Sequence, residues 1–234
     1  MGTGWLIRDD IIVTGGDVVY DWKFQLGGCT QMKCYIGYNG RESVKSVQVQ
    51  SRHGVNVVTT ADWVKTNQNR ARDVAFIKVD RPFQGNLGLF KFAATPLSGE
   101  GINLGVVGYP GDKTFGDEQG GQMYAEFANT SYDLDDSPNN LLDYRISTFG
   151  GKFAFTSNPS LLTTTLGQNG APVLRKDGGQ LVSIGTHCYG DGEQCNSGTS
   201  IDNKYGNNYE GYVGLFNDPS TFGNQVNFVK VPPQ

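Results

Sequence analysis

The stretch LGQNGAPVL, residues 166–174, decides the assignment of the fold. Two glycines surround its polar centre and Pro172 opens an apolar run, a pattern typical of a tight turn that leads into a strand. The same pattern is typical of a loop that holds a nucleophile between glycines. Its centre, however, is Asn169, whose amide cannot attack a carbonyl group as an activated hydroxyl does. The stretch is therefore either an accidental likeness or an active-site loop without its nucleophile.

Composition and turn spacing predict an all-β chain. The 234 residues include 33 glycines, and short apolar or alternating runs recur between Gly and Asp turn signals. A chain of this length fits one large all-β domain or two small barrels. A passage rich in Gly and Pro at residues 82–100 divides the chain into halves with similar numbers of expected strands.

Individual elements can be placed from these runs. The expected strands are residues 4–7, 10–15, 33–39, 43–52, 56–64, 73–79, 101–109, 122–128, 141–148, 171–175, 180–189, 198–201 and 211–216. Helical turns are expected only near residues 61–68 and 218–226. No internal sequence repeat links the two halves.

The charge balance argues against two classes of partner. The net charge is −4 and the isoelectric point is about 5.2, so no basic surface for nucleic acid or anionic lipid is expected. No run of about 20 apolar residues is present, so no membrane-spanning segment is expected. A peptide or protein is the expected class of partner, and the sequence leaves the oligomeric state open.

The four cysteines fall into two close pairs, Cys29 with Cys34 and Cys188 with Cys195. Each spacing suits a small loop closed by a disulfide, which predicts a secreted or extracytoplasmic protein. A zinc site with four thiolate ligands is a rival interpretation, but the spacing within the pairs is not typical of one. Free thiols in a cytoplasmic protein are the third interpretation.

Several stretches, taken in order, resemble the chymotrypsin-like serine peptidases, and most closely their glutamyl endopeptidase (V8-like) branch. They are GTGWLIRDDIIVTGGDVVYD (residues 2–21), RDVAFIKVDRPF (72–83), VVGYPGDK (106–113), LGQNGAPVL (166–174), VSIGTHCYG (182–190) and NSGTSI (196–201). The resemblance covers nearly the whole chain and implies two six-stranded-type antiparallel β-barrels with a cleft between them. The implied barrels comprise residues 1–95 and 96–234. The pattern begins inside an early strand, so the first barrel is expected to be truncated at its N-terminus, and a short C-terminal helix is also expected.

The chemistry of that family requires a hydroxyl nucleophile, an imidazole that transfers its proton, and a carboxylate that orients the imidazole. Carried over by position, the resemblance places Asp73 at the carboxylate position. Asp17 stands at the imidazole position and Asn169 at the nucleophile position. The only histidines are His53 and His187, and neither lies in the triad stretches. The resemblance therefore implies a peptidase homologue with an incomplete triad.

Other parts of the family pattern are retained. Gly167 and Asn169 match the positions whose backbone N–H groups form the oxyanion hole. His187 and Thr164 match the residues that recognise a substrate carboxylate in the glutamyl-specific branch. The resemblance thus implies a catalytically inactive protein, without cofactor or metal, that binds a peptide or protein in the former cleft with a preference for acidic groups. An apparent insertion at residues 149–165 is expected to reshape or cover that cleft.

Three interpretations of the altered triad remain open. Asp17 and Asp73 could share a proton and act as an acid–base pair in an enzyme with repurposed chemistry. Asp17, Asp73 and Asn169 could instead offer oxygen ligands to a hard cation, although three ligands are few for calcium. In the third interpretation the two carboxylates have drifted apart, solvated or hydrogen-bonded to the backbone, in a site without catalysis.

Overall fold

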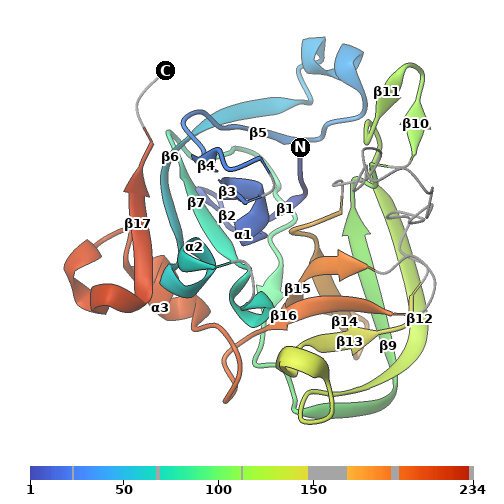
Figure 1. Ribbon diagram of the computed structural model, residues 1–234. Coiled ribbons are helices and arrows are strands. Elements are labelled where there is room, and N and C mark those ends of the chain that lie inside the picture. The colour runs from blue at the N-terminus through green and yellow to red at the C-terminus, as the bar shows by residue number, and fades with distance from the viewer. Residues whose placement is uncertain (23, 67–68, 112, 147–167, 191–194, 232–234) are drawn as a thin grey trace.

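The protein is built mainly from antiparallel strands in two sheets, as the computed structural model in Figure 1 shows. The structure describes residues 1–22, 24–66, 69–111, 113–146, 168–190 and 195–231. The first sheet has six strands, in the order β1-β2-β7-β6-β17 with β5 paired to β6. Their bounds are Gly4–Arg8 (β1), Ile11–Thr14 (β2), Lys33–Ile36 (β5), Gln50–Thr60 (β6), Ala75–Val79 (β7) and Val226–Lys230 (β17).

The second sheet has seven strands, in the order β12-β9-β14-β15-β16-β13, and β8 pairs with β15 in parallel. Their bounds are Lys91–Phe92 (β8), Ser98–Gly108 (β9), Tyr124–Asp133 (β12), Leu142–Tyr144 (β13), Pro172–Asp177 (β14), Gln180–Gly190 (β15) and Asn196–Ser200 (β16). The strands at the two ends of this order, β12 and β13, are consecutive in the chain, and the sheet curls into a nearly closed barrel. The first sheet forms a half-barrel, so the predicted all-β architecture of two antiparallel barrel-like units is confirmed.

Short elements connect these strands. Two small hairpins pair Tyr20–Asp21 (β3) with Gly27–Gly28 (β4) and Thr114–Phe115 (β10) with Glu118–Gln119 (β11). The α-helices are Gly16–Val19 (α1), Ala61–Lys65 (α2) and Tyr209–Gly214 (α3). The 3-10 helices are Arg41–Lys45 (η1), Arg70–Arg72 (η2), Pro138–Asn140 (η3) and Pro219–Gln225 (η5).

The first sheet is buried on both faces, which explains why all four residues of its inner strand β2 are buried. Ile11 and Val13 face one core cluster, whereas Ile12 faces the other, as the alternation of a strand requires. The cluster around Ile11 is completed by Tyr209 and Tyr212 of α3. A third cluster fills the second barrel with side chains from β9, β12, β13, β14 and β15.

The C-terminal segment differs from the sequence-based expectation. Residues 211–216 were expected to form a strand, but Tyr209–Gly214 forms α3, because the Asn208 side chain caps the helix by accepting the Gly211 N–H. The following strand β17, which was not expected, pairs antiparallel with β6 and therefore belongs to the first sheet (Figure 1). The two sheets are therefore not contiguous in sequence. Likewise, η1 replaces the beginning of the strand expected at residues 43–52.

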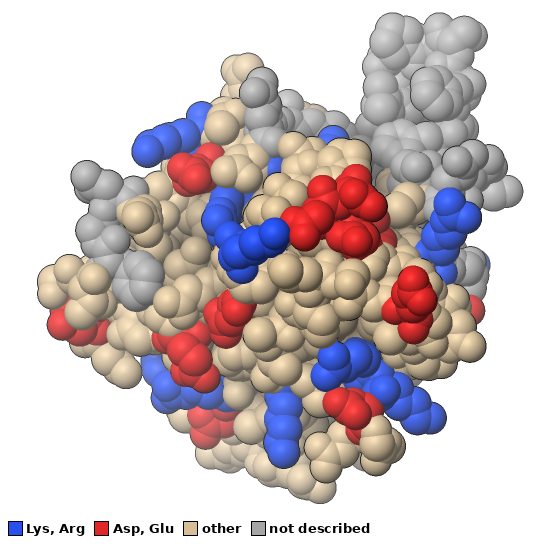
Figure 2. Space-filling model, turned by 90° about the horizontal axis from the view of Figure 1, so that it is seen from below, with Lys and Arg blue, Asp and Glu red and all other residues tan. Residues whose placement is uncertain are grey.

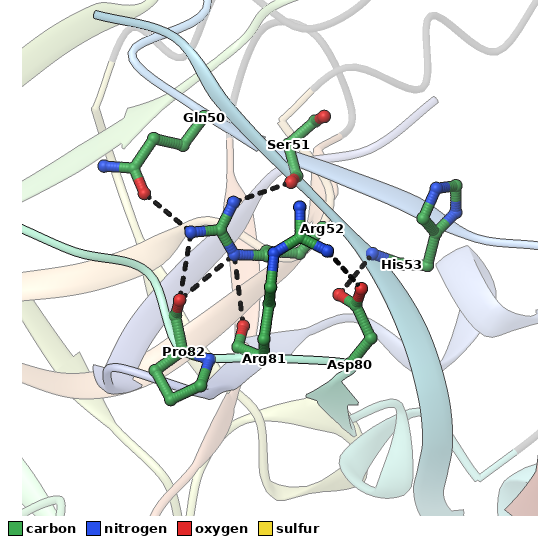
Figure 3. A network of polar contacts seen from close by, with 7 residues as sticks. All are labelled: Gln50, Ser51, Arg52, His53, Asp80, Arg81 and Pro82. Carbon is green, nitrogen blue, oxygen red and sulfur yellow. Dashed lines mark hydrogen bonds and ion pairs between the residues drawn. The ribbon is translucent and has the colours of Figure 1, made fainter.

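A buried guanidinium fixes the course of the chain as it leaves the first sheet (Figure 3). Arg52 of β6 is 7% exposed, and its Nε donates to the carbonyl oxygens of Arg81 at 3.2 Å and Pro82 at 3.1 Å. The remaining guanidinium nitrogens donate to the Gln50 side chain and the Ser51 carbonyl, each at 2.8 Å, and again to Pro82. These bonds hold the segment after β7 against β6, from which it proceeds towards the second sheet.

The molecular surface carries charges of both signs. On the face seen in Figure 2, acidic and basic side chains stand in small groups among uncharged residues. Within the described part of the chain, no helix is long and apolar enough to cross a membrane.

Candidate functional site

Asp17 is positioned by two glycines at the start of α1. A Cβ atom on Gly16 would lie 2.7 Å from Trp63 Cδ1 and 3.0 Å from Asp73 Oδ1. A Cβ atom on Gly15 would lie 2.5 Å from Asp17 Oδ1. Because glycine has no such atom, α1 packs directly against Trp63 and Asp73, and the sequence TGGD brings the Asp17 backbone to the Asp73 carboxyl.

Asp73 is fully buried immediately before β7 and is bound from both sheets. Its Oδ1 accepts the Asp17 backbone N–H at 2.9 Å. Its Oδ2 accepts the hydroxyl of Tyr189 in β15 at 2.5 Å, and its backbone carbonyl accepts the Cys188 thiol at 3.0 Å. Asp73 therefore links the first sheet to β15 of the second.

The turn at residues 168–171 brings Asn169 to the same place. The Gly170 N–H donates to the His187 carbonyl at 2.7 Å, which ties the turn to β15, and the Thr3 N–H donates to the Asn169 carbonyl at 3.0 Å. The Asn169 side-chain amide then donates to Asp17 Oδ2 at 2.5 Å. The structure thus places Asn169, Asp17 and Asp73 in one hydrogen-bonded series.

The chemistry of this series differs from that of a peptidase triad. An amide N–H of Asn169 binds a carboxyl group at the point where a hydroxyl would have to give up its proton. Neither histidine side chain joins the series: the His53 backbone N–H donates to Asp80 at 2.9 Å, and His187 Nδ1 lies 2.6 Å from the Tyr144 hydroxyl. Within the described residues, the series therefore contains neither a nucleophilic hydroxyl nor an imidazole.

Burial dominates the electrostatics of the two carboxyl groups. It raises the pKa of Asp17 to about 6, although the Asn169 hydrogen bond acts in the opposite direction. Burial also raises the pKa of Asp73 well above its ordinary value, and the nearby charge of Asp17 adds to this effect. No hydrogen bond joins the two carboxyl groups themselves, and Asp17 Oδ1 is shut off from solvent without a partner in the described structure. The contact that a shared proton would need is thus missing.

The cation interpretation meets a different obstacle. Asn169 presents its amide nitrogen to Asp17, and a nitrogen that carries hydrogens is not a metal ligand. Within the described ranges, no group of three or more His, Cys, Asp or Glu residues could hold a metal ion.

The remaining predicted site residues lie in different parts of the chain, and not all of them are described. Gly167, Thr164 and the insertion at residues 149–165 lie outside the described residues. His187 is 3% exposed in β15, next to the turn that carries Asn169. A register shift against β16 separates His187 from Tyr189, which in a regular strand would share a face. His187 consequently bonds to Tyr144 of the second barrel, while Tyr189 bonds to Asp73. Sequence reasoning missed both tyrosines, because neither partnership leaves a local signal.

The predicted disulfides are not confirmed, since all four cysteines are free thiols in the structure. Cys188 is buried and donates to the backbone of Asp73 instead of approaching Cys195. Cys29 and Cys34 pack at the edge of the same core cluster, and burial raises the pKa of the Cys34 thiol to about 12. The secreted location inferred from these pairs stays a prediction.

Comparison with known proteins gives a consistent picture. No family model matches the chain. A glutamyl endopeptidase from Bacillus licheniformis is 26% identical over 211 residues, which cover 85% of this chain and 55% of that protein. The chain thus spans about half the length of this curated relative.

Solved structures agree at the level of the fold. A Glu endopeptidase superimposes with a TM-score of 0.62 at 20% identity, covering 92% of this chain and 82% of the other. A mutant of human heparin binding protein superimposes with a TM-score of 0.59 at 15% identity, covering 93% and 86%.

The turn that carries Asn169 should not tolerate a side chain at position 170. Gly170 has φ +91°, and an added Cβ would lie 2.2 Å from the Thr3 carbonyl oxygen. Gly179 has φ +87° with open space around it, so Gly179→Ala isolates the backbone strain. In urea unfolding we expect Gly179→Ala to cost about 1 kcal/mol and Gly170→Ala roughly 3 kcal/mol or more. Equal losses would show that the close approach of Thr3 and Gly170 is not maintained.

Asp17 should make the folded state less stable as the pH rises. Its folded pKa of about 6 exceeds the ordinary carboxyl pKa of 3.8, so its contribution is fully present below pH 3.8 and is lost as the pH passes 6. Relative to the wild type, Asp17→Asn should therefore gain up to about 3 kcal/mol of unfolding free energy between pH 4 and pH 7. Urea unfolding across this range checks the slope. The exposed control Asp136→Asn should follow the wild type, and a parallel curve for Asp17→Asn would contradict the assignment.

Proposed function

We propose that this chain, a chymotrypsin-like serine peptidase homologue related to the glutamyl endopeptidase branch, does not hydrolyse peptides but binds a peptide or protein segment at the former active site. The observation that carries the proposal is the 2.5 Å hydrogen bond from the Asn169 amide to the Asp17 carboxyl group. It occupies the place where the family's chemistry needs a hydroxyl group and an imidazole.

The loss of hydrolysis follows from the chemistry of the replacements. An amide is not a nucleophile at neutral pH, and the Asp17 carboxyl has no hydroxyl proton to accept from Asn169. Enzymes of this type that lack triad members retain rates only about 10³ to 10⁴ above the reaction in water. What remains of the site is therefore suited to binding far better than to turnover.

The geometry that supports binding is retained around the missing nucleophile. Gly170 keeps a conformation that favours glycine, and its N–H bond to His187 anchors the turn to β15. The Asn169 backbone N–H donates to no group among the described residues, so it is available to donate to a carbonyl or carboxylate oxygen of a ligand. The preference for acidic groups that the family resemblance implies belongs to His187 and Thr164, of which only His187 lies in the described structure.

One observation favours an alternative function, an enzyme that uses Asp17 and Asp73 as an acid–base pair. A pKa of about 6 for Asp17 suits proton transfer near neutral pH. The Asp73 oxygens, however, are already occupied by the Asp17 backbone and the Tyr189 hydroxyl. Turnover that peaks near pH 6 and disappears in Asp17→Asn would favour this alternative over the binding protein.

Inactivity can be tested with a serine-directed fluorophosphonate. The native protein should not be labelled, because among the described residues no activated hydroxyl lies beside Asp17. The double variant Asp17→His with Asn169→Ser restores imidazole and hydroxyl on the retained backbone and should be labelled. Asn169→Ser alone lacks the imidazole and should react at least about 10³-fold more slowly than the double variant. Stoichiometric labelling of the native protein, read by intact mass spectrometry, would overturn the proposal.

Binding can be tested on an array of immobilised peptides. The native protein should be retained by a subset of peptides, and Asn169→Trp should weaken that retention at least tenfold because the bulky ring occupies the turn. The control Asn217→Trp adds the same ring at an exposed position and should bind as the native protein does. Unchanged retention by Asn169→Trp would locate the binding surface elsewhere, and no retention of the native protein would remove the binding function.

A further inference from the structure

The pair formed by His187 and Tyr144 is a built polar contact inside the second barrel. Tyr144 of β13 is 1% exposed, and its hydroxyl lies 2.6 Å from His187 Nδ1 of β15. Strand β16 runs between them and places Gly198 opposite His187, so no side chain at that register position separates the ring from the hydroxyl. The contact thus depends on three strands and fixes the orientation of the imidazole.

The direction of this hydrogen bond follows from the protonation and burial of the Tyr144 hydroxyl. Burial raises the pKa of Tyr144 well above its ordinary value, so the hydroxyl keeps its proton. His187 Nδ1 is the only hydrogen-bond partner of that hydroxyl among the described residues. If the hydroxyl only accepted, its own hydrogen would stay unpaired in the core, at a cost of about 1–3 kcal/mol. Tyr144 therefore donates to Nδ1, and the neutral ring carries its hydrogen on Nε2.

The imidazole is also kept neutral. Burial lowers the pKa of His187 to about 4, and no charged group contributes to that shift. The titratable groups around the pair are Tyr144 itself, Asp143, Cys188 and Cys195. The Asp143 carboxylate is held by hydroxyl groups, including that of Ser197 at 2.5 Å. At neutral pH, His187 consequently offers one uncharged donor, the Nε2–H, which has no partner in the described structure.

An uncharged donor in a buried place discriminates between acceptors. A carboxylate that moves from water into such a place loses its hydration and finds no positive charge to compensate for the loss. A carboxamide oxygen is uncharged, so a single hydrogen bond from the N–H is enough to replace its contact with water. We propose that His187, oriented by Tyr144, is a specificity-determining residue that selects a neutral carboxamide, as in Gln or Asn, over a carboxylate. The inference rests on the proposed peptide-binding function. It replaces the acidic preference that family resemblance implies with a preference for a neutral side chain of similar shape.

The tautomer can be measured without any ligand. The chain has two histidines, so ¹⁵N-histidine NMR with a His53→Gln variant assigns both rings. We expect His187 to be the Nε2–H tautomer from pH 5 to pH 8. Tyr144→Phe should convert it to a mixture of tautomers. Tyr132→Phe is the matched control, because Tyr132 is buried in the same cluster and its hydroxyl has no partner in the described residues. A charged ring at pH 7, or an unchanged tautomer in Tyr144→Phe, would overturn the proposal.

Selectivity can be measured in the same spectra. The probes are the tripeptide amides Ac-Ala-Ala-Gln-NH2 and Ac-Ala-Ala-Glu-NH2, titrated at pH 7.5 against the His187 Nε2 signal. We expect the glutamine peptide to bind at least tenfold more tightly, and Tyr144→Phe to reduce that ratio to about threefold or less. Equal or tighter binding of the glutamate peptide would overturn the selectivity and leave peptide binding intact. If neither peptide shifts the signal while the array above retains the protein, His187 does not read the ligand, which also overturns the inference. Failure of the array itself would instead refute the proposed function.

Discussion

The buried carboxyl group of Asp73 is the interaction on which the rest of the site depends. A carboxyl group without solvent must have its oxygens hydrogen-bonded, and the donors here are the Asp17 backbone and the Tyr189 hydroxyl. One donor lies in α1, which packs beside the first sheet, and the other in β15 of the second sheet. The two sheets must therefore meet in one relative position before Asp73 is satisfied, and that position also brings Asn169 within reach of Asp17.

The residues that the family resemblance assigns to the triad positions stabilise one another. A carboxyl group at position 17 places two acids in one poorly hydrated region, which raises the pKa of each. Asn169 compensates by supplying an amide donor to Asp17, which a nucleophilic hydroxyl engaged in catalysis could not do permanently. In the proposed binding protein, fixed hydrogen bonds take the place of a proton relay, and the turn with its glycines holds the groups that make them.

Local patterns in the sequence predicted those features that are local in cause. Short apolar runs between turn signals predicted β2 and β7, and the glycines around Asn169 predicted the turn. The residues 211–216 have a strand-like composition, but the Asn208 cap and the burial of Tyr209 in the first core make α3 there. The bonds from Tyr189 to Asp73 and from Tyr144 to His187 join residues distant in sequence, so no spacing rule could reveal them. Cysteine spacing likewise says nothing about whether two thiols are presented to each other.

The pairing of β17 with β6 has a consequence for biosynthesis. A ribosome delivers β6 long before β17, and in between the β6 edge that β17 covers exposes backbone N–H and C=O groups without partners. Pairings between distant segments also form slowly, because the intervening chain must first be closed into a loop. The first sheet therefore cannot be completed while the strands of the second sheet are still being synthesised. The nascent chain therefore passes through a stage in which it needs protection from edge-to-edge association with its neighbours, and this need ends only when β17 has been released.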